Sequence, residues 1–255
     1  MVTGASSGIG AATAIALATA GADVLVHARS NRAAAAITAA AIDKQGARAR
    51  VVFADLRDMA EQDRLVEQAI AWHGRVDVWV NNAGADVLTG DAAEWSFERK
   101  FEEVWRVDVV GTMRLSRLIG RHMKDGGEAG DRAIVNIGWD QAAQGMAGDS
   151  GEMFAASKGA IMAFTRSLAQ SLAPRVRVNC AAPGWIRTAW GDQATATWQQ
   201  RALAESLVER WGTADDVAQA ITFLASPGAA FITGQVLPVN GGFRYGHAPL
   251  RQESP

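Results

Sequence analysis

Short apolar runs rich in β-branched residues alternate with alanine-rich segments of helical period along almost the whole chain. This alternation predicts repeated strand–helix units around a parallel sheet that carries helices on both faces. Because crossovers between parallel strands are right-handed, we expect a doubly wound α/β fold of about seven strands. The expected strands are Met1–Thr3, Ala22–Ala28, Arg50–Ala54, Val76–Val80, Ala133–Ile137, Val176–Cys180 and Gln235–Val239.

The ends of the intervening helices carry their own signals. Asp58 and Glu61 are spaced as in a capping box, and Gly74 is the expected end of the helix that they begin. The other expected helices are Ala11–Ala20 before Gly21, Asn31–Gln45 after Ser30, Phe97–Met123, Met153–Ala173 and one that begins at Thr213. No linker, repeat or low-complexity tract divides the chain, so residues 1–255 are expected to form a single domain.

Charge and cysteine content narrow the possible functions. The chain has 25 Lys and Arg against 27 Asp and Glu, which gives a net charge of −2 without a basic run, so nucleic acid is not an expected partner. The single cysteine, Cys180, forms neither an intramolecular disulfide nor a zinc cluster, which predicts a cytoplasmic protein. The four histidines lack metal-ligand spacing, so no metal site is expected.

The first 22 residues carry no charged side chain but are interrupted by hydroxyl groups and glycines, and no basic segment precedes them. They are therefore predicted to belong to the folded domain, and no membrane association is expected. Only two residues precede Thr3-Gly4, whereas a strand in a protein usually has about five. Either the first strand is short or the true start of the chain lies upstream.

A glycine-rich turn follows this first strand. Thr3–Gly10 reads TGASSGIG, in which the glycines are spaced GxxxGxG, and a helix follows. Glycines let a main chain approach a pyrophosphate closely, and the helix N-terminus then faces the negative charge. The turn therefore indicates nucleotide binding, although a glycine-rich turn can also pack a helix on a strand without any ligand.

The residues after the next strands refine this hypothesis. Where an acidic residue would bind an adenosine ribose, the sequence has Ala28 and then Arg29. A guanidinium there suits a 2′-phosphate and favours NADP(H) over NAD(H), the alternative being a solvated loop charge. Asp55 can be a turn residue, and Asn81–Gly84 is small enough to lie beneath a cofactor.

Several motifs occur in a fixed order over nearly the whole length: Thr3–Gly10, Asp55-Leu56, Asn81–Gly84, Ala156-Ser157-Lys158, Pro183–Thr188, Ile232–Gln235 and Asn240-Gly241. Together they resemble the short-chain dehydrogenase/reductase family, closest in style to its ketoacyl-reductase-like branch. The resemblance implies a Rossmann-type sheet, a nicotinamide cofactor, and a homodimer or homotetramer built through the two long helices. The cofactor-binding residues that it implies are Gly4, Ser6, Ser7, Gly8, Ile9, Arg29, Asp55, Leu56, Asn82, Ala83, Gly84, Lys158, Pro183, Gly184, Ile186 and Thr188.

The catalytic residues depart from the family pattern. The resemblance implies an Asn, Ser, Tyr and Lys set, in which the tyrosine donates a proton to the substrate. Lys158 is kept, but Phe154 stands at the tyrosine position and Asp108 at the asparagine position. The serine position falls on Trp139, or on Asp140 if the loop shifts. Losing the tyrosine hydroxyl should cripple carbonyl reduction unless another donor replaces it, since general acid–base catalysis contributes about 10²- to 10⁴-fold in rate.

Several carboxylates could supply this proton. Asp140, just past a strand end, is our preferred candidate, although a loop carboxylate is more often merely solvated. Asp108 could instead balance the charge of Lys158, which would then mainly bind the nicotinamide ribose. Asp149 and Glu152 read more readily as a capping box on the following helix. Tyr245, the only tyrosine, lies near the C-terminus.

Aromatic residues surround the expected substrate cavity. The resemblance places Trp139, Phe154, Trp185 and Trp190 there. Their flat apolar faces suit a flat or apolar small molecule, although they could equally have filled the space of a disused site.

Three functions remain open on the sequence. The first is an atypical NADP(H)-dependent oxidoreductase with Lys158, Asp140 and Asp108 as its catalytic residues. The second is a catalytically silent member that binds cofactor or ligand as a sensor or partner subunit. The third is elimination or isomerisation without net redox change.

Overall fold

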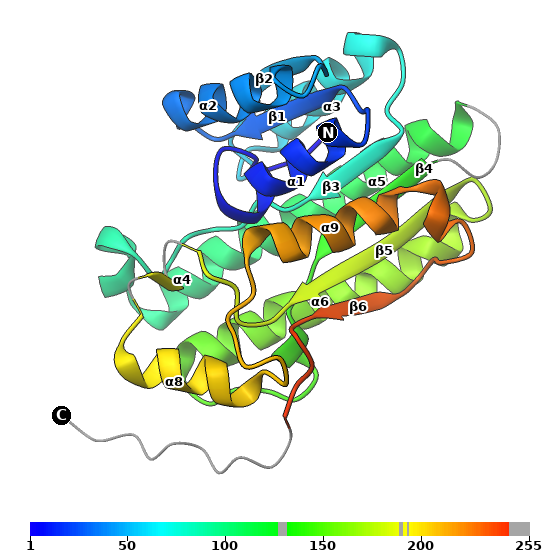
Figure 1. The fold of residues 1–255 in the computed structure, drawn as a ribbon. Helices are drawn as coiled ribbons and strands as arrows, with labels where there is room; N and C mark the ends of the chain where they lie inside the picture. Colours follow the sequence, from blue (N-terminus) through cyan, green and yellow to red (C-terminus); the bar gives the residue numbers. More distant parts are fainter. Residues whose placement is uncertain (127–131, 189–190, 193, 245–255) are drawn as a thin grey trace.

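The computed structural model describes residues 1–126, 132–188, 191–192 and 194–244. The six strands found in these ranges are all parallel (Figure 1). They are β1 (Val24–Ala28), β2 (Ala49–Phe53), β3 (Val78–Asn81), β4 (Arg132–Ile137), β5 (Val176–Pro183) and β6 (Val236–Val239). Five of them agree with the expected strands to within two residues at each end, and β5 continues three residues further, to Pro183.

The expected first strand is reduced to one residue. Val2 forms isolated parallel bridges with Val26 of β1 and Val80 of β3, and so joins the β1–β2 pair to the β3–β4–β5–β6 group. The expectation of about seven strands is thus corrected to six strands and one bridging residue in the described part of the chain. Residues 3–6 form a turn directly after Val2, so the ladder ends there.

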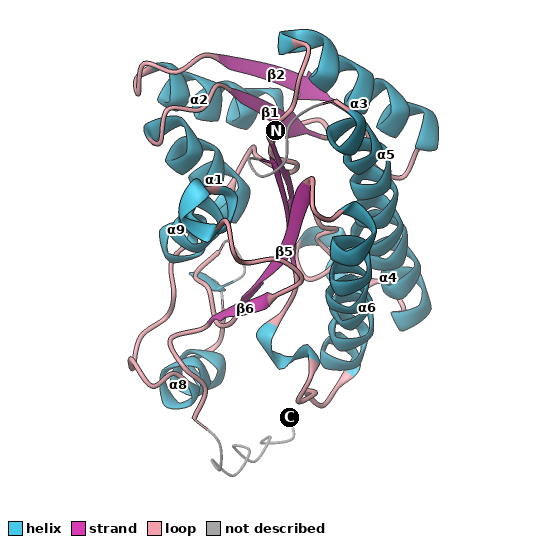
Figure 2. Cartoon of the chain, turned by 90° about the vertical axis from the view of Figure 1, so that its right-hand side faces the viewer, coloured by secondary structure: helices cyan, strands magenta, loops and turns pink. Residues whose placement is uncertain are grey.

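Helices cover both faces of the sheet, as expected (Figure 2). Successive strand residues face opposite layers: Trp79 and Ile134 pack in the core under one set of helices, and Val80 and Val135 in the core under the other. The helices are α1 (Gly8–Thr19), α2 (Arg32–Asp43), α3 (Met59–His73), α4 (Phe97–Val104), α5 (Thr112–Asp125), α6 (Asp149–Leu172), α8 (Ala196–Glu205) and α9 (Ala214–Ala225). Short 3-10 turns occupy η1 (Gly90–Glu94), η3 (Asp140–Ala142) and η4 (Pro227–Ala229).

Four helix starts differ from expectation. The α1 helix begins at Gly8, three residues before the expected Ala11. Asn31, not Ser30, caps α2 and accepts a hydrogen bond from the Ala34 amide. Asp58 caps α3, but the Glu61 carboxylate accepts the Asp55 amide instead of returning to the cap residue. The expected box of Asp149 and Glu152 is absent, because α6 begins one residue earlier than a cap at Asp149 requires and Gly148 occupies the cap position.

The expected helix over Phe97–Met123 is divided. Between α4 and α5 lies η2 (Trp105–Gly111), a π-helical segment. Such segments are rare and often occur at functional sites. Asp108 lies within it and is 2% exposed, so the irregular segment carries a buried carboxylate toward the interior of the molecule.

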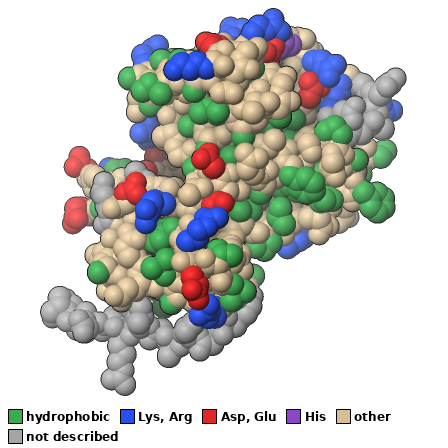
Figure 3. All heavy atoms as spheres, viewed as in Figure 1, with side chains coloured by type: hydrophobic (Ala, Val, Ile, Leu, Met, Phe, Trp, Pro, Cys, Tyr) green, Lys and Arg blue, Asp and Glu red, His purple; other side chains and the backbone are tan. Residues whose placement is uncertain are grey.

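Acidic and basic side chains are interspersed on the face shown in Figure 3, without a broad region of one sign. Among the described residues, no helix is long and apolar enough to span a membrane.

Candidate functional site

The glycine-rich turn lies between the Val2 bridge and α1, and it is closely packed. Gly4 has a φ of +62°, and a Cβ on it would lie 2.8 Å from the Cα of Ala83. A Cβ on Gly10 would lie 2.2 Å from the Gly4 carbonyl oxygen. Side chains at these two positions would push the turn away from its neighbours, so the glycines are required by contact as well as by conformation.

Thr3 and Asn82 tie this turn to the segment after β3. The Thr3 hydroxyl oxygen accepts the main-chain amides of Asn82 and Ala83 at 2.9 and 3.0 Å. The Asn82 side-chain amide donates to the carbonyls of Thr3 and Gly4 at 3.0 and 3.2 Å. The structure therefore brings the predicted residues Gly4, Asn82 and Ala83 together.

The remaining residues of the turn are more open. Gly8 begins α1 with a φ of +53°, Ser7 is exposed, and Ser6 and Ile9 are half-buried. Ser7 stands at the cap position of α1, yet its side chain makes no capping hydrogen bond. The amides of this first turn are thus left for a ligand or water.

A second group lies past the ends of β1 and β2. Arg29 is exposed, Leu56 is buried, and Asp55 is bound by Arg57 through paired nitrogen–oxygen contacts, two of them at 2.9 and 3.0 Å. The hydrogen bonds from Arg57 lower the pKa of Asp55, and the charge of Arg29 lowers it further. Asp55 is thus an ion-paired residue and more than a simple turn residue. The sequence reasoning did not include Arg57.

Lys158 and Asp108 form the most enclosed charged pair of the site. The Lys158 Nζ lies 2.8 Å from Asp108 Oδ2, and the two side chains are 13% and 3% exposed. The other carboxylate oxygen of Asp108 accepts the Ala85 amide at 2.8 Å. A Cβ on Gly84 would come within 3.0 Å of Asp108 Oδ2, so the pair lies directly against the Asn82–Gly84 segment.

Phe154 lies one helical turn before Lys158 on α6. Its half-buried ring packs against an apolar cluster of Val87, Val104 and Met153. The ring is therefore held by core contacts and has no polar atom to offer to Lys158.

Asp140 lies at the start of η3, two residues after Gly138, which follows β4. Its Oδ2 accepts the side-chain amide of Asn240 at 3.0 Å, and a Cβ on Gly184 would lie 2.9 Å from the same oxygen. Its Oδ1 is buried and has no well-formed hydrogen-bond partner among the described residues. Burial raises the pKa of Asp140 to about 6, although the Asn240 hydrogen bond opposes the shift.

The segment after β5 carries the other predicted residues. Pro183 ends β5, the Gly184 amide donates to Val239 at 3.1 Å, Ile186 is buried, and Thr188 is half-buried. Together these contacts fix the segment against the end of β6.

Trp185 packs in a different aromatic group from the apolar cluster that holds Phe154. It packs against Trp198 and Trp211 at ring-centroid distances of 5.6 and 5.9 Å, and its Nε1 donates to Glu205 at 2.8 Å. Trp139 is half-buried, whereas Trp190 and Tyr245 lie outside the described residues. The sequence reasoning missed Trp198, which α8 brings onto Trp185.

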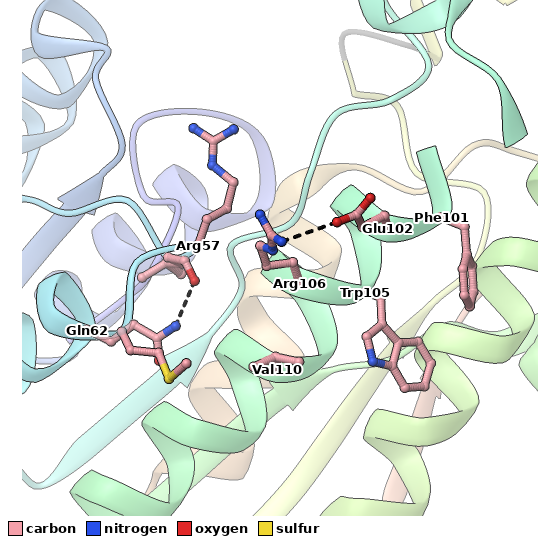
Figure 4. A pocket seen from close by; sticks show the side chains of 9 residues that line it. Arg57, Gln62, Phe101, Glu102, Trp105, Arg106 and Val110 are labelled. Carbon is pink, nitrogen blue, oxygen red and sulfur yellow. Dashed lines mark hydrogen bonds and ion pairs between the residues drawn. The ribbon is translucent and has the colours of Figure 1, made fainter. Parts of the chain in front are cut away.

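A pocket of about 420 Å³ lies beside Asp55 and Leu56, between the start of α3 and the α4–η2 region (Figure 4). Its wall is mainly apolar, with an Arg106–Glu102 ion pair at one side. The lining residues are Leu56, Arg57, Met59, Gln62, Phe101, Glu102, Trp105, Arg106 and Val110. The pocket thus adjoins the candidate adenosine end of the site but contains none of the candidate catalytic residues.

Comparisons with known proteins agree with this geometry. A family model described as enoyl-(acyl carrier protein) reductase matches residues 4–244. The chain is 38% identical over 254 residues to the short-chain reductase protein NovJ of Streptomyces niveus. This match covers 95% of the present chain and 92% of NovJ. The chain is also 35% identical to the 3-oxoacyl-(acyl-carrier-protein) reductase FabG of Escherichia coli over 95% of both chains. The chain is a short-chain dehydrogenase/reductase.

A solved short-chain dehydrogenase supports the same conclusion. The structure of 7α-hydroxysteroid dehydrogenase complexed with NADH and 7-oxo glycochenodeoxycholic acid matches with a TM-score of 0.85 at 32% identity, over 95% of this chain and 92% of that one. Short-chain dehydrogenases/reductases are NAD(P)-dependent oxidoreductases that act on small molecules, and the present chain is of this type. The closely packed glycine turn and the adjoining Asn82–Gly84 segment fit a dinucleotide.

Proposed function

We propose that this short-chain dehydrogenase/reductase is a cytoplasmic NADP(H)-dependent oxidoreductase that acts on a flat or apolar small molecule and uses a proton donor other than tyrosine. The observation that carries the proposal is the half-buried Lys158 ammonium, held 2.8 Å from the buried Asp108 carboxylate against the Asn82–Gly84 segment. A lysine kept in this place can bind the nicotinamide ribose, and Asp108 positions it there.

The choice of NADP(H) rests on Arg29. Its guanidinium is close enough to Asp55 to lower the pKa of that carboxyl, at the end of the sheet where the adenosine ribose would lie. Arg57 already neutralises Asp55, so Arg29 can bind a 2′-phosphate without losing an essential partner. When bound, NADPH supplies the hydride that reduces a carbonyl carbon.

Asp140 is the proposed proton donor. Phe154 has no proton to give, whereas the raised pKa of Asp140, about 6, keeps part of the population protonated near neutral pH. Asn240 binds the Oδ2 of Asp140, and the buried Oδ1 has no well-formed hydrogen bond among the described residues. In reduction, the protonated carboxyl gives its proton to the substrate oxygen as that oxygen gains charge, and the carboxylate then takes a proton from water.

The proposed substrate class rests on the aromatic residues. Trp185 packs with Trp198 and Trp211 just past β5, and Trp139 lies just past β4. Flat apolar faces of this kind bind planar or alicyclic molecules. The ketosteroid in the related 7α-hydroxysteroid dehydrogenase structure has this character, which supports the same class for the present chain.

We further propose a homodimer or homotetramer built through the α4–α5 and α6 helices. Trp105 and Val110, both on η2, are each 38% exposed, which is unusual for large apolar side chains beside an apolar pocket. Light scattering of the purified protein should give a multiple of 27.0 kDa, and a Val110→Lys variant should shift toward that monomer mass.

The decisive experiment is a fluorescence titration of the purified protein with NADPH and with NADH, followed by NADPH-consumption assays over a panel of cyclic and aromatic ketones. Nine tryptophans provide the signal. We expect micromolar binding of NADPH, which corresponds to about −8 kcal/mol, and consumption of NADPH in step with a defined alcohol. Turnover should fall in Lys158→Ala and Asp140→Asn.

A second function is a catalytically silent binding protein. Two observations fit it: Lys158 is ion-paired with Asp108, and Phe154 packs against an apolar cluster. Tight NADPH binding without hydride transfer to any ketone would favour that second function. Product formation without net cofactor change would instead indicate elimination or isomerisation.

A further inference from the structure

We infer that His27 is a positioning residue for the cofactor: its neutral imidazole holds the Gly4 amide and so sets the shape of the turn that receives the pyrophosphate. The inference rests on the proposed function only in taking this turn as the dinucleotide site. It extends that function to a side chain beneath the site.

The hydrogen bonds of His27 determine which ring nitrogen carries the proton. His27 lies in β1 and is 2% exposed. Its Nε2 is 2.9 Å from the Ala54 carbonyl oxygen, and its Nδ1 is 3.1 Å from the Gly4 amide nitrogen. A carbonyl only accepts and an amide only donates, so Nε2 carries the hydrogen and Nδ1 is the acceptor.

The Gly4 amide is held at a place where the turn has little room to move. On one side a Cβ on Gly4 would meet Ala83 at 2.8 Å, and on the other the imidazole accepts its amide. The His27 carbonyl also accepts the Ala5 amide at 2.8 Å. His27 therefore fixes two consecutive amides of the turn, one through its side chain and one through its main chain.

This arrangement requires an uncharged ring. A second proton on Nδ1 would point at the Gly4 N–H and replace a hydrogen bond with a contact between two donors. Burial lowers the pKa of His27, although the nearby Asp55 charge opposes the shift. Asp55 is itself bound by Arg57, so the ring remains neutral at the pH of the cytoplasm.

A turn that is already ordered loses less conformational entropy when a ligand binds. Without the His27 acceptor the Gly4 amide loses its hydrogen bond in a half-buried position, and the turn relaxes toward other conformations. The effect should fall on ligands that contain the pyrophosphate and spare those that bind only at the adenosine end.

Two substitutions separate positioning from core packing. In His27→Gln the side-chain amide can still donate to Ala54, as Nε2 does, but no acceptor reaches Gly4. In His27→Asn the side-chain oxygen takes the place of Nδ1 and accepts the Gly4 amide, while the Ala54 contact is lost. Each variant removes one of the two side-chain hydrogen bonds of His27, so we expect similar losses of stability in denaturant titrations.

The test compares NADPH with 2′-AMP, which lacks the pyrophosphate, as ligands of the wild type and both variants. We expect His27→Gln to weaken NADPH by roughly tenfold or more while its Kd for 2′-AMP stays within about twofold, and His27→Asn to bind both ligands nearly as the wild type does. The ¹⁵N chemical shifts of the ligand-free wild type should also show an unprotonated Nδ1.

The opposite results are equally clear. If both variants bind NADPH with the wild-type Kd, or if His27→Gln weakens 2′-AMP as much as NADPH, His27 is only a core residue and the inference is overturned. If the wild type binds neither NADPH nor NADH, the proposed function fails as well. Wild-type binding of the cofactor thus distinguishes the two failures.

Discussion

Asp108 and Lys158 are fifty residues apart in the chain and meet at 2.8 Å as an ion pair whose carboxylate is buried and whose ammonium is half-buried. A charge in such a place is costly to leave alone, because its partner cannot be replaced by bulk water. Loss of either partner should therefore both destabilise the fold and disturb the candidate active site.

Replacing Asp108 with alanine should destabilise the protein by about 3 kcal/mol or more, since the Lys158 ammonium would lose its partner. Denaturant unfolding followed by tryptophan fluorescence would measure the change. A matched control is Glu102→Ala, which removes the exposed partner of Arg106 and should change stability by less than about 1 kcal/mol. Equal effects of the two substitutions would mean that the buried pair adds no more than a surface one.

Asp140 should make stability depend on pH. Its folded-state pKa of about 6 lies above the ordinary value of 3.8, so its contribution is fully present below pH 3.8 and is lost as the pH rises through 6. Asp140→Asn should therefore stabilise the protein at pH 8, by up to about 3 kcal/mol from a shift of about two units. The advantage should disappear as the pH falls toward 4.

Unfolding curves of the wild type and Asp140→Asn at several pH values would check this dependence. The asparagine can still accept the Asn240 side-chain amide, so the comparison isolates the charge. A constant difference between the two proteins from pH 4 to 8 would contradict a raised pKa.

A hydroxyl restored beside Lys158 should increase carbonyl reduction. Phe154→Tyr places a phenol one helical turn before Lys158, and Asp108→Asn in the same chain releases the ammonium from its carboxylate. Adding a general acid contributes about 10²- to 10⁴-fold in many enzymes, so we expect the double variant to reduce simple ketones at least tenfold faster than the wild type. The assay is NADPH consumption at saturating ketone.

The single variants are the controls for this experiment. Asp108→Asn alone should give no gain, because it supplies no proton donor. Unchanged rates in the double variant, with NADPH binding intact, would show that the surroundings of Phe154 do not admit a substrate carbonyl.

Arg29→Asp should discriminate between the two cofactors. The substitution removes a guanidinium and places a carboxylate where the 2′-phosphate would lie, so NADPH should bind at least tenfold more weakly while NADH keeps or improves its affinity. Arg48→Asp makes the same change in charge at the opposite end of the sheet, where Arg48 precedes β2 and binds Asp23. The Arg48→Asp control should leave the ratio of NADPH to NADH affinity unchanged. If Arg29→Asp weakens the binding of NADPH and NADH equally, the proposed contact between Arg29 and the 2′-phosphate is wrong.

Hydropathy and turn residues were sufficient to predict the sheet and its flanking helices. The β5 strand is buried along its whole length, as expected of a strand covered on both faces of a parallel sheet, although it includes Arg177 and Asn179 among its apolar residues. The helix starts were less predictable: Ser30 and Asn31 are both good cap residues, and only the main-chain path decides between them. The neighbouring residues alone do not determine that main-chain path.

The candidate site was predictable where its residues stand at positions that the family motifs identify. The pairing of Asp108 with Lys158 was an expectation from the sequence, and the structure confirms the contact. The contacts of His27 with Gly4 and of Asn240 with Asp140 were missed because those partners lie far away in the sequence. Arg57 was missed although its partner Asp55 is only two residues away. A histidine in an apolar strand was the only signal available for His27.

The division of the Phe97–Met123 helix has a consequence for its two parts. Residues at ordinary helical spacing, Phe97, Phe101 and Val104 on α4 and Leu115, Ile119 and Met123 on α5, suggest one continuous stripe, yet they pack in two separate cores. A π-helical turn takes up an extra residue, which rotates everything before it by about 100° relative to everything after it. If Trp105–Gly111 were a regular α-helix with no residue removed, the two parts would come back into phase, and then either the support of Phe154 or the covering of the sheet would be lost.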